Sequence, residues 1–327
     1  MNKILIIQTA FIGDVILATP LIEKLHDFYP EAKIDFLLRK GNEALFNEHP
    51  KLNSVLIWDK KKVKYLGLLK MIVEVRNEKY DLVVNLQRFA ASGLMTMLSN
   101  GKQRIGFDKN PFSFGYTDKV KHEIGNGLHE TVRNLKLIRQ ITGQKYYRPK
   151  LYPTFEDEEK VKSLRVDNYI CIAPTSVWYT KQYPESKWLE LISRIDSSTT
   201  IYLLGAPADF DAAERIKEKA NRANTINLCG ELGFLASAAL MKTAKMNYVN
   251  DSAPMHMASA VNAPTTAIYC STLPSFGFGP LASVAHVVEI EKKLACRPCG
   301  LHGLEACPLK HFNCSHQIDT SIIPLPQ

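Results

Sequence analysis

The sequence lacks long hydrophobic runs. Among its 327 residues no stretch of about twenty apolar residues occurs, so no membrane-spanning helix is expected. The first residues, Met1-Asn2-Lys3, lead at once into a strand-like run and show neither the apolar length nor the cleavage site of a signal peptide. We therefore expect a cytoplasmic protein.

Two nucleotide-binding motifs are also missing. The first strand-to-helix turn reads Q-T-A-F-I-G-D at residues 8–14 and contains no G-x-G-x-x-G, which argues against a nicotinamide-dependent enzyme. No G-x-x-x-x-G-K-[ST] occurs, which excludes a P-loop NTPase. The formal net charge of +8 favours nucleic acid, anionic lipid or phosphorylated substrates as partners, and charge alone does not choose among them.

Strand-like and helix-like segments alternate in both halves of the chain. Strands are expected over residues 3–9, 33–38, 54–58, 81–87, 169–173 and 200–204, and helices over 14–28, 63–77, 90–99, 129–142, 187–195 and 208–220. Residues 144–153 have no clear period and two prolines, as in a crossing between domains. The pattern predicts an α/β protein of two domains, 1–150 and 151–327, each a parallel sheet with helices on both faces.

The stretch Tyr248–Thr272 organises the second half. It reads as a strand end, a polar turn at residues 250–252 whose side chains cap a helix, a helix with Pro254 at its first position, and a buried strand at Thr265–Tyr269. A helix that starts at the carboxyl end of a parallel strand is an anion site. An ordinary capped helix is the alternative.

Two further turns carry charged residues. Asp14 lies in G-D-V-I-L-A-T-P at residues 13–20, at the start of the first helix, where it is either a helix cap or a general base. Lys181 lies in A-P-T-S-V-W-Y-T-K-Q-Y-P at residues 173–184, after a strand, where it either neutralises a phosphate or is one more exposed lysine.

Taken together, these motifs resemble glycosyltransferase family 9, the ADP-heptose:lipopolysaccharide heptosyltransferases. The resemblance rests on G-D-V-I-L-A-T-P, K-x-Y-P-x-x-x-W at 181–188, N-L-C-G-E-L at 227–232, N-D-S-A-P-M-H at 250–256, A-P-T at 263–265, and the cysteine-bearing segment Cys296–Cys314. It implies a GT-B fold, two Rossmann-like doubly wound domains facing a cleft. The acceptor would bind the first domain and the nucleotide sugar the second, and an inverting transfer would move a heptose from an ADP-sugar to a lipopolysaccharide-core saccharide.

The resemblance also implies site residues. Asp14 would be the base, Thr175, Ser176 and Lys181 would contact the donor phosphates, and Asp251 the donor sugar hydroxyls. Ser252, Ala253 and His256 would surround the diphosphate. This chain departs from the family at Ala253, where glycine is usual, and in an irregular ending over 315–327. A related transferase with another donor or acceptor, or a non-catalytic nucleotide-binding module, are the alternatives; Asp14 and Lys181 argue against the module.

No cofactor is expected for catalysis. The D-x-D pattern that holds a metal in many nucleotide-sugar transferases occurs only as Asp209-Phe210-Asp211, where helix capping explains it better. The helix start at Ser252–Ala253 and the charge of Lys181 would stabilise the departing diphosphate. The expected partners are an ADP-sugar and a phosphorylated lipid-linked saccharide, and no nucleic acid.

Four of the seven cysteines cluster at Cys296, Cys299, Cys307 and Cys314. In a cytoplasmic protein this cluster indicates either a structural zinc site or free, redox-active thiols. Cys171, Cys229 and Cys270 are expected to pack in strands and loops. The basic run Lys60-Lys61-Lys62-Val63-Lys64, with leucines after it, predicts peripheral contact with the inner membrane face, the alternative being a solvated helix start.

Overall fold

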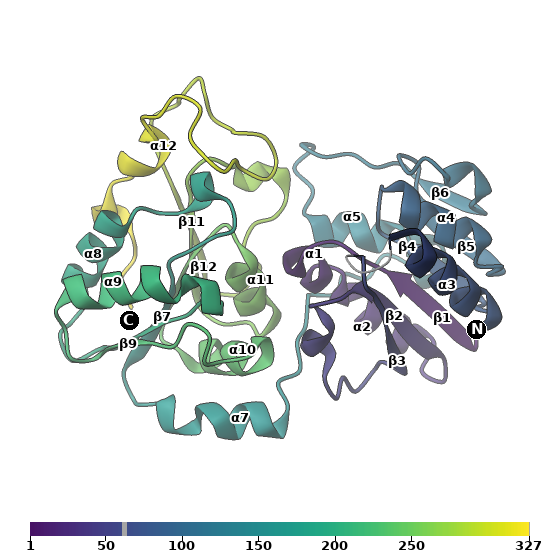
Figure 1. Cartoon of the computed structure of the whole chain (residues 1–327), viewed down its shortest axis with the longest axis horizontal. Coiled ribbons are helices and arrows are strands. Elements are labelled where there is room, and N and C mark those ends of the chain that lie inside the picture. The colour runs from purple at the N-terminus through teal and green to yellow at the C-terminus, as the bar shows by residue number, and fades with distance from the viewer. Residues whose placement is uncertain (61–63, 327) are drawn as a thin grey trace. The chain divides into compact units, whose positions relative to one another are not determined.

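The chain forms two compact units, Met1–Tyr152 and Pro153–Gln327, in the computed structural model, which describes residues 1–60 and 64–326 (Figure 1). The division falls within the segment 144–153 that the sequence indicated as a crossing. In the described part of the chain, no helix has the length and apolarity needed to cross a bilayer.

Unit 1 is built on a six-stranded parallel sheet with the order β3-β2-β1-β4-β5-β6. The strands are β1 (Lys3–Ile7), β2 (Lys33–Arg39), β3 (Ser54–Trp58), β4 (Leu82–Asn85), β5 (Gln103–Phe107) and β6 (Asp118–Val120). Ile4, Leu5, Ile6 and Ile7 on the central strand are fully buried. Such an unbroken apolar run is typical of a parallel strand that is covered by helices on both faces.

Two helices expected in unit 1, over 14–28 and 129–142, are each divided in the structure. The helices of this unit are α1 (Ile12–Ile16), α2 (Thr19–Phe28), α3 (Lys64–Asn77), α4 (Ala90–Leu98), α5 (Glu130–Lys136) and α6 (Arg139–Thr142). The single helix expected over 14–28 is therefore two helices. Pro20 has no N–H to continue a helical ladder, and the hydroxyl of Thr19 donates to the carbonyl of Ile16 at 2.7 Å, so the chain restarts at Thr19.

Unit 2 repeats the design with a six-stranded parallel sheet in the order β12-β11-β10-β7-β8-β9. Its strands are β7 (Tyr169–Ala173), β8 (Thr200–Leu203), β9 (Thr225–Asn227), β10 (Asn247–Asn250), β11 (Thr265–Tyr269) and β12 (Ala285–Glu289). Its helices are α7 (Phe155–Val161), α8 (Glu185–Arg194), α9 (Phe210–Ala220), α10 (Phe234–Thr243), α11 (Ala253–Ala260) and α12 (Asn313–His316).

Both sheets have the same winding. Counted within its own unit, each sheet has the strand order 3-2-1-4-5-6, which is the Rossmann order. The doubly wound class was expected from the sequence, but the strand order was not. The order reverses between β1 and β4 in unit 1 and between β7 and β10 in unit 2. Ligands of such sheets bind outside the carboxyl ends of the strands at this reversal. A ligand is therefore expected at the loops after β1, β7 and β10.

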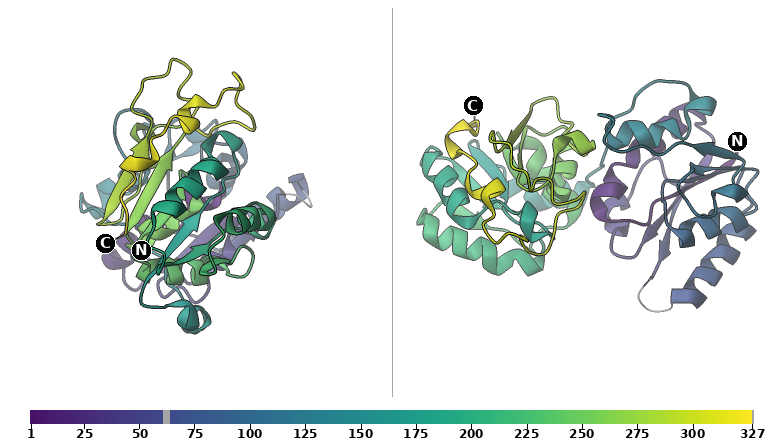
Figure 2. Two further views of the ribbon diagram at one scale, coloured as in Figure 1. Left: turned by 90° about the vertical axis from the view of Figure 1, so that its left-hand side faces the viewer. Right: turned by 90° about the horizontal axis from the view of Figure 1, so that it is seen from above.

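The segment after β12 runs back over unit 2 (Figure 2, yellow). Between Glu289 and Asn313 it contains neither helix nor strand, and after α12 only a short 3-10 turn, Thr320–Ile322, interrupts an irregular course. It adds Phe312, Cys314, Ile318 and Ile323 to the core of unit 2. The irregular ending was predicted from 315 onward, but residues 315 and 316 belong to α12; from 317 to 326 the course is irregular apart from the 3-10 turn.

Candidate active site

In unit 1, Asp14 follows the carboxyl end of β1. The chain leaves Ile7 and turns through Gln8–Phe11 into α1, where Asp14 is the third helical residue and half-buried. The N-cap position belongs to Phe11, so Asp14 is not the N-cap residue. Its carboxylate lies in the first turn of α1.

Two cations lie beside this turn. The ammonium of Lys60 donates to the carbonyl and hydroxyl of Thr9 at 2.8 and 3.1 Å. The guanidinium of Arg39, the last residue of β2, lies 4.5 Å from the ring centroid of Phe11. Burial, helped by Arg39, lowers the pKa of Lys60. Lys60, the first residue of the basic run, therefore points to the end of β1; residues 61–63 of that run lie outside the described residues.

In unit 2, a buried amide joins the ends of β7 and β10. Asn250, the last residue of β10, is fully buried. Its amide nitrogen donates to the carbonyls of Pro174 and Thr175 at 2.9 and 3.2 Å, and its oxygen accepts from the backbone N–H of Tyr183 at 2.9 Å. Asn250 thus fixes the turn that carries Thr175 and Ser176 to the loop that carries Lys181. The sequence predicted a helix-capping side chain at Asn250 and not this role, for which the signal is a polar residue at the end of a buried strand.

Lys181 and Asp251 form an ion pair. The Nζ–Oδ2 distance is 2.8 Å, and the side chains are only 13% and 8% exposed. The hydroxyl of Thr272, after β11, donates to the same Oδ2 at 2.6 Å. Since β10 pairs with both β7 and β11, the sheet itself brings these three residues together. Lys181 and Asp251 were predicted as site residues from separate motifs, and Thr272 was not predicted.

The helix that follows Asp251 starts at Ala253. Ser252 is its N-cap residue, but the Ser252 side chain makes no capping hydrogen bond, and Asn250 belongs to β10; the expectation that side chains of this turn cap α11 is wrong on this point. Pro254 is the second helical residue, not the first. Ala253 has no positive φ, so alanine at a glycine position of the family strains no backbone there. His256 is buried one turn further along.

The D-x-D pattern has a backbone role. Asp209 ends the 3-10 turn Pro207–Asp209 and is the N-cap residue of α9. Its carboxylate accepts from the N–H of Ala206 at 2.8 Å. The side chain makes no capping hydrogen bond to α9, so the capping expected of this pattern occurs at the preceding 3-10 turn and not at the helix itself.

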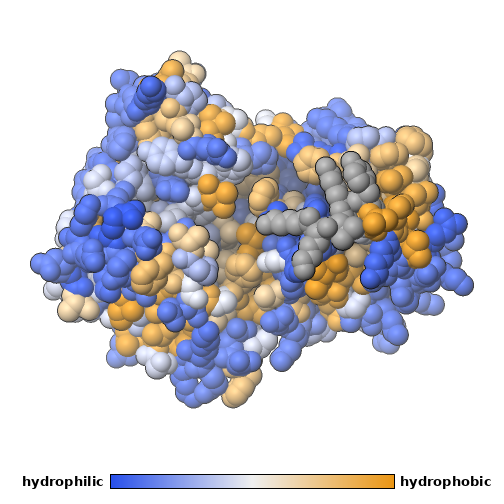
Figure 3. Space-filling view, in the orientation of Figure 1, coloured by the Kyte–Doolittle hydropathy of each residue, from blue (hydrophilic) through white to orange (hydrophobic). Residues whose placement is uncertain are grey.

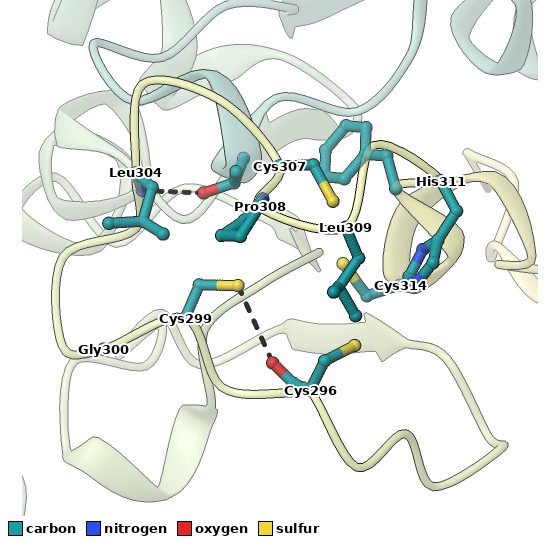
Figure 4. Close-up of a pocket in the computed structure, with 11 residues that line it drawn as sticks. Cys296, Cys299, Gly300, Leu304, Cys307, Pro308, Leu309, His311 and Cys314 are labelled. Atoms are coloured by element: carbon teal, nitrogen blue, oxygen red, sulfur yellow. Dashed lines mark hydrogen bonds between the residues drawn. The ribbon is translucent and has the colours of Figure 1, made fainter.

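The four clustered cysteines line one pocket of about 400 Å³, together with His311 and Phe312 (Figure 4). All four are free thiols, and burial raises the pKa of Cys299 and raises that of Cys314 to about 11. Among residues 1–60 and 64–326, no three His, Cys, Asp or Glu side chains are arranged so that they could hold a metal ion. The four-cysteine metal site therefore stays a prediction.

The other three cysteines, as expected, pack inside unit 2. Cys171 lies on β7, Cys270 follows β11, and Cys229 lies in the loop after β9; each is at most 3% exposed. Burial raises the pKa of Cys229 to about 12 and that of Cys270 to about 12. These thiols stay protonated at neutral pH and serve packing.

Comparison with known proteins identifies the family. The model of glycosyltransferase family 9 (heptosyltransferase) matches residues 68–301. Lipopolysaccharide heptosyltransferase 3 of Escherichia coli is 28% identical over 280 residues, covering 80% of this chain and 82% of the relative. Lipopolysaccharide heptosyltransferase 1 of Campylobacter coli is 24% identical and covers 89% of this chain and 90% of its own length.

Solved structures show the same fold. The E. coli ADP-heptose lipopolysaccharide heptosyltransferase II superimposes with a TM-score of 0.77 at 23% identity, covering 89% of this chain and 91% of that chain. The E. coli heptosyltransferase WaaC, solved with ADP-2-deoxy-2-fluoro heptose, gives 0.71 at 21% identity, covering 88% and 93%. The resemblance drawn from the motifs is confirmed, and the chain belongs to glycosyltransferase family 9, the heptosyltransferases, with the GT-B fold of a glycosyltransferase.

Proposed function

We propose that the protein transfers a heptose from ADP-heptose to a saccharide of the lipopolysaccharide core, with inversion at the anomeric carbon. The observation that carries the proposal is the buried cluster of Lys181, Asp251 and Thr272 at the strand-order reversal of unit 2, next to the start of α11. Unit 2 then binds the donor and unit 1 the acceptor. Relatives named as heptosyltransferases, one of them solved with an ADP-heptose analogue, support this choice.

The donor diphosphate would lie between the β7 turn and the start of α11. Thr175 and Ser176 offer hydroxyls and backbone N–H groups from one side, and the helix start at Ser252 and Ala253 offers N–H groups and a positive dipole end from the other. Lys181 supplies a full charge. Asp251 already holds Lys181 through Oδ2, so we assign its Oδ1 to a sugar hydroxyl, and the buried His256 backs the diphosphate turn.

The transfer itself is a single displacement. An acceptor hydroxyl attacks the anomeric carbon, Asp14 takes the proton of that hydroxyl, and the bond from the anomeric carbon to the phosphate oxygen breaks. The departing ADP gains negative charge on that oxygen. Lys181 and the α11 start stabilise this charge, which is greater in the transition state than in the bound donor.

The acceptor would be anionic. Arg39 and Lys60 place two cations at the carboxyl edge of the unit 1 sheet, beside the turn that leads to Asp14. A phosphorylated saccharide matches this charge, and the net charge of +8 draws such an acceptor from a distance.

A donor panel tests the proposal. ADP-heptose, GDP-mannose and UDP-glucose are each offered with a lipopolysaccharide-core acceptor, and nucleotide release is measured. We expect ADP release that depends on the acceptor and falls when acceptor phosphates are removed enzymatically. Acceptor-dependent release of UDP or GDP, with none of ADP, would show a family member of another donor specificity.

Unit 1 also presents an apolar stripe that suits a membrane surface. Met71, Ile72 and Val75 bury one face of α3. On the opposite face Leu66, Leu69 and Val73, spaced like one side of a helix, are 69%, 57% and 57% exposed.

Apolar surface gathers over this region of unit 1 (Figure 3). Lys70 and Arg76 outnumber Glu74 among the exposed charges of α3. We propose that the protein works in the cytoplasm and that this stripe rests on the anionic inner membrane, where a lipid-linked acceptor is anchored.

Vesicle sedimentation tests the membrane contact. The variant Leu66→Ser/Leu69→Ser/Val73→Ser should lose most binding to phosphatidylglycerol vesicles, because it removes the apolar surface while the core face of α3 is unchanged. Phe155→Ser, which changes an 80% exposed residue of α7 in unit 2, is the matched control and should bind as the wild type does. Equal binding by the triple variant would refute the contact.

A further inference from the structure

The cysteine-bearing segment packs directly against the loop that carries Lys181. The backbone N–H of Thr180 donates to the carbonyl of Leu304 at 3.1 Å, and the N–H of Leu304 donates to the Thr180 hydroxyl at 2.8 Å. A Cβ built on Gly303 would come within 2.9 Å of the Lys181 Cγ. The segment is thus in contact with both Thr180 and the stem of Lys181.

The same segment is tied to the strand end that holds Asp251. The N–H of Cys299 donates to the carbonyl of Ser271 at 2.9 Å, and the guanidinium of Arg297 donates to the carbonyl of Thr272 at 2.7 Å. Thr272 in turn donates its hydroxyl to Asp251. The segment therefore supports both partners of the Lys181–Asp251 pair.

This support has little regular structure of its own. Between Glu289 and Asn313 no helix or strand supplies backbone hydrogen bonds within the described chain. The four thiols of the segment line one pocket (Figure 4). The other walls of this pocket are largely apolar and include Leu304, Pro308, Leu309 and Phe312. An irregular segment of this length is normally held by a packed core, a disulfide or a metal.

We propose that Cys296, Cys299, Cys307 and Cys314 together bind one thiophilic metal ion, with Zn²⁺ as the expected ion. This ion holds the segment against Thr180 and Lys181. Four sulfur ligands suit tetrahedral zinc, with Zn–S distances of about 2.3 Å. In the structure the four thiols line one pocket but are not arranged as metal ligands, so metal binding requires their side chains to turn toward one point. Four S–H bonds release their protons to water, four S–metal bonds form, and nothing is oxidised or reduced.

Metal content is the first test, and it does not depend on activity. Tag-free protein, purified reduced and incubated with Zn²⁺ before desalting, should carry about one zinc per chain. Cys296→Ser/Cys299→Ser should carry none, and Cys229→Ala, a cysteine outside the pocket, should keep it. Wild-type protein without tightly bound metal, with all four thiols open to a thiol reagent or joined in disulfides, would overturn the site.

Hydrogen–deuterium exchange at Thr180 tests the link to Lys181. The Thr180 N–H is protected by the Leu304 carbonyl, so removal of the metal should speed its exchange by about tenfold or more, while amides of β7 stay unchanged. Unchanged exchange at Thr180 in the metal-free protein would overturn the positioning role. The catalytic role of Lys181 rests on the proposed function. Neither the metal measurement nor the exchange measurement uses a sugar donor, so a negative result in either one refutes the metal site or its link to Lys181 without refuting the proposed transfer.

Discussion

Lys181→Ala is expected to lower kcat by about a hundredfold or more, equivalent to about 3 kcal/mol of transition-state stabilisation. As the glycosidic bond breaks, charge grows on the phosphate oxygen nearest the sugar. A lysine beside that oxygen interacts with it more strongly in the transition state than in the bound donor. Donor binding should therefore weaken less than kcat falls, which initial rates and calorimetry with ADP measure separately.

Because Lys181 is paired with Asp251, Lys181→Ala can lower activity through lost stability as well as through lost catalysis, and a second variant is needed to separate the two. Lys181→Ala leaves the nearly buried Asp251 without its cation, which destabilises unit 2. The double variant Lys181→Ala/Asp251→Asn removes that unpaired charge, so it should recover thermal stability without recovering kcat. Lys217→Ala, at an exposed lysine of α9, should behave as the wild type does. If stability and kcat recover together, Lys181 supports the fold and not the leaving group.

Lys181→Arg should recover part of the lost rate, because a planar guanidinium does not place its charge where an ammonium does. Added Mg²⁺ should not rescue Lys181→Ala, since Asp209 uses its carboxylate to bind the Ala206 N–H. Strong rescue by Mg²⁺ would contradict the assignment of leaving-group stabilisation to Lys181 and return Asp209 and Asp211 to consideration as metal ligands.

Asp14→Asn is expected to lower kcat by about a hundredfold or more and to leave ADP binding unchanged. Asparagine keeps the shape of the side chain but cannot take the proton of the acceptor hydroxyl. Loss of a carboxylate from the first turn of α1 should cost less than about 1 kcal/mol in stability, because the dipole contribution of such a residue is small.

Turnover and calorimetry separate these contributions of Asp14. Glu31→Gln, which removes an exposed carboxylate from the same unit, is the matched control. Near-normal kcat in Asp14→Asn would mean that Asp14 serves only the first turn of its helix.

The sequence predicted the fold because the central strands are strongly apolar. β1, β7 and β11 are buried along nearly their whole length, and each was expected close to its observed bounds. The strands that were missed include β6 and β9, which are short and partly exposed at sheet edges. Such strands have little apolar signal, so pattern alone does not mark them.

The site was predicted residue by residue, but its contacts were not. Lys181 and Asp251 meet only because β7 and β10 are neighbours at the strand-order reversal, a feature of topology that local patterns do not contain. Asn250 was expected to help cap α11 and instead binds the turn after β7. The support of the Lys181 loop by Leu304 and Gly303 depends on the path of an irregular segment. Helix capping at Ser252 was expected from residue type and does not occur.

The most direct test of the proposed transfer is the intact mass of the acceptor. Purified protein, ADP-heptose and a phosphorylated lipopolysaccharide-core saccharide are incubated, and acceptor mass and ADP are followed together. We expect each acceptor molecule to gain one heptosyl unit for each ADP released, as the proposed transfer requires. Release of ADP without a gain in acceptor mass, or an acceptor unchanged while ADP-heptose stays intact, would contradict it.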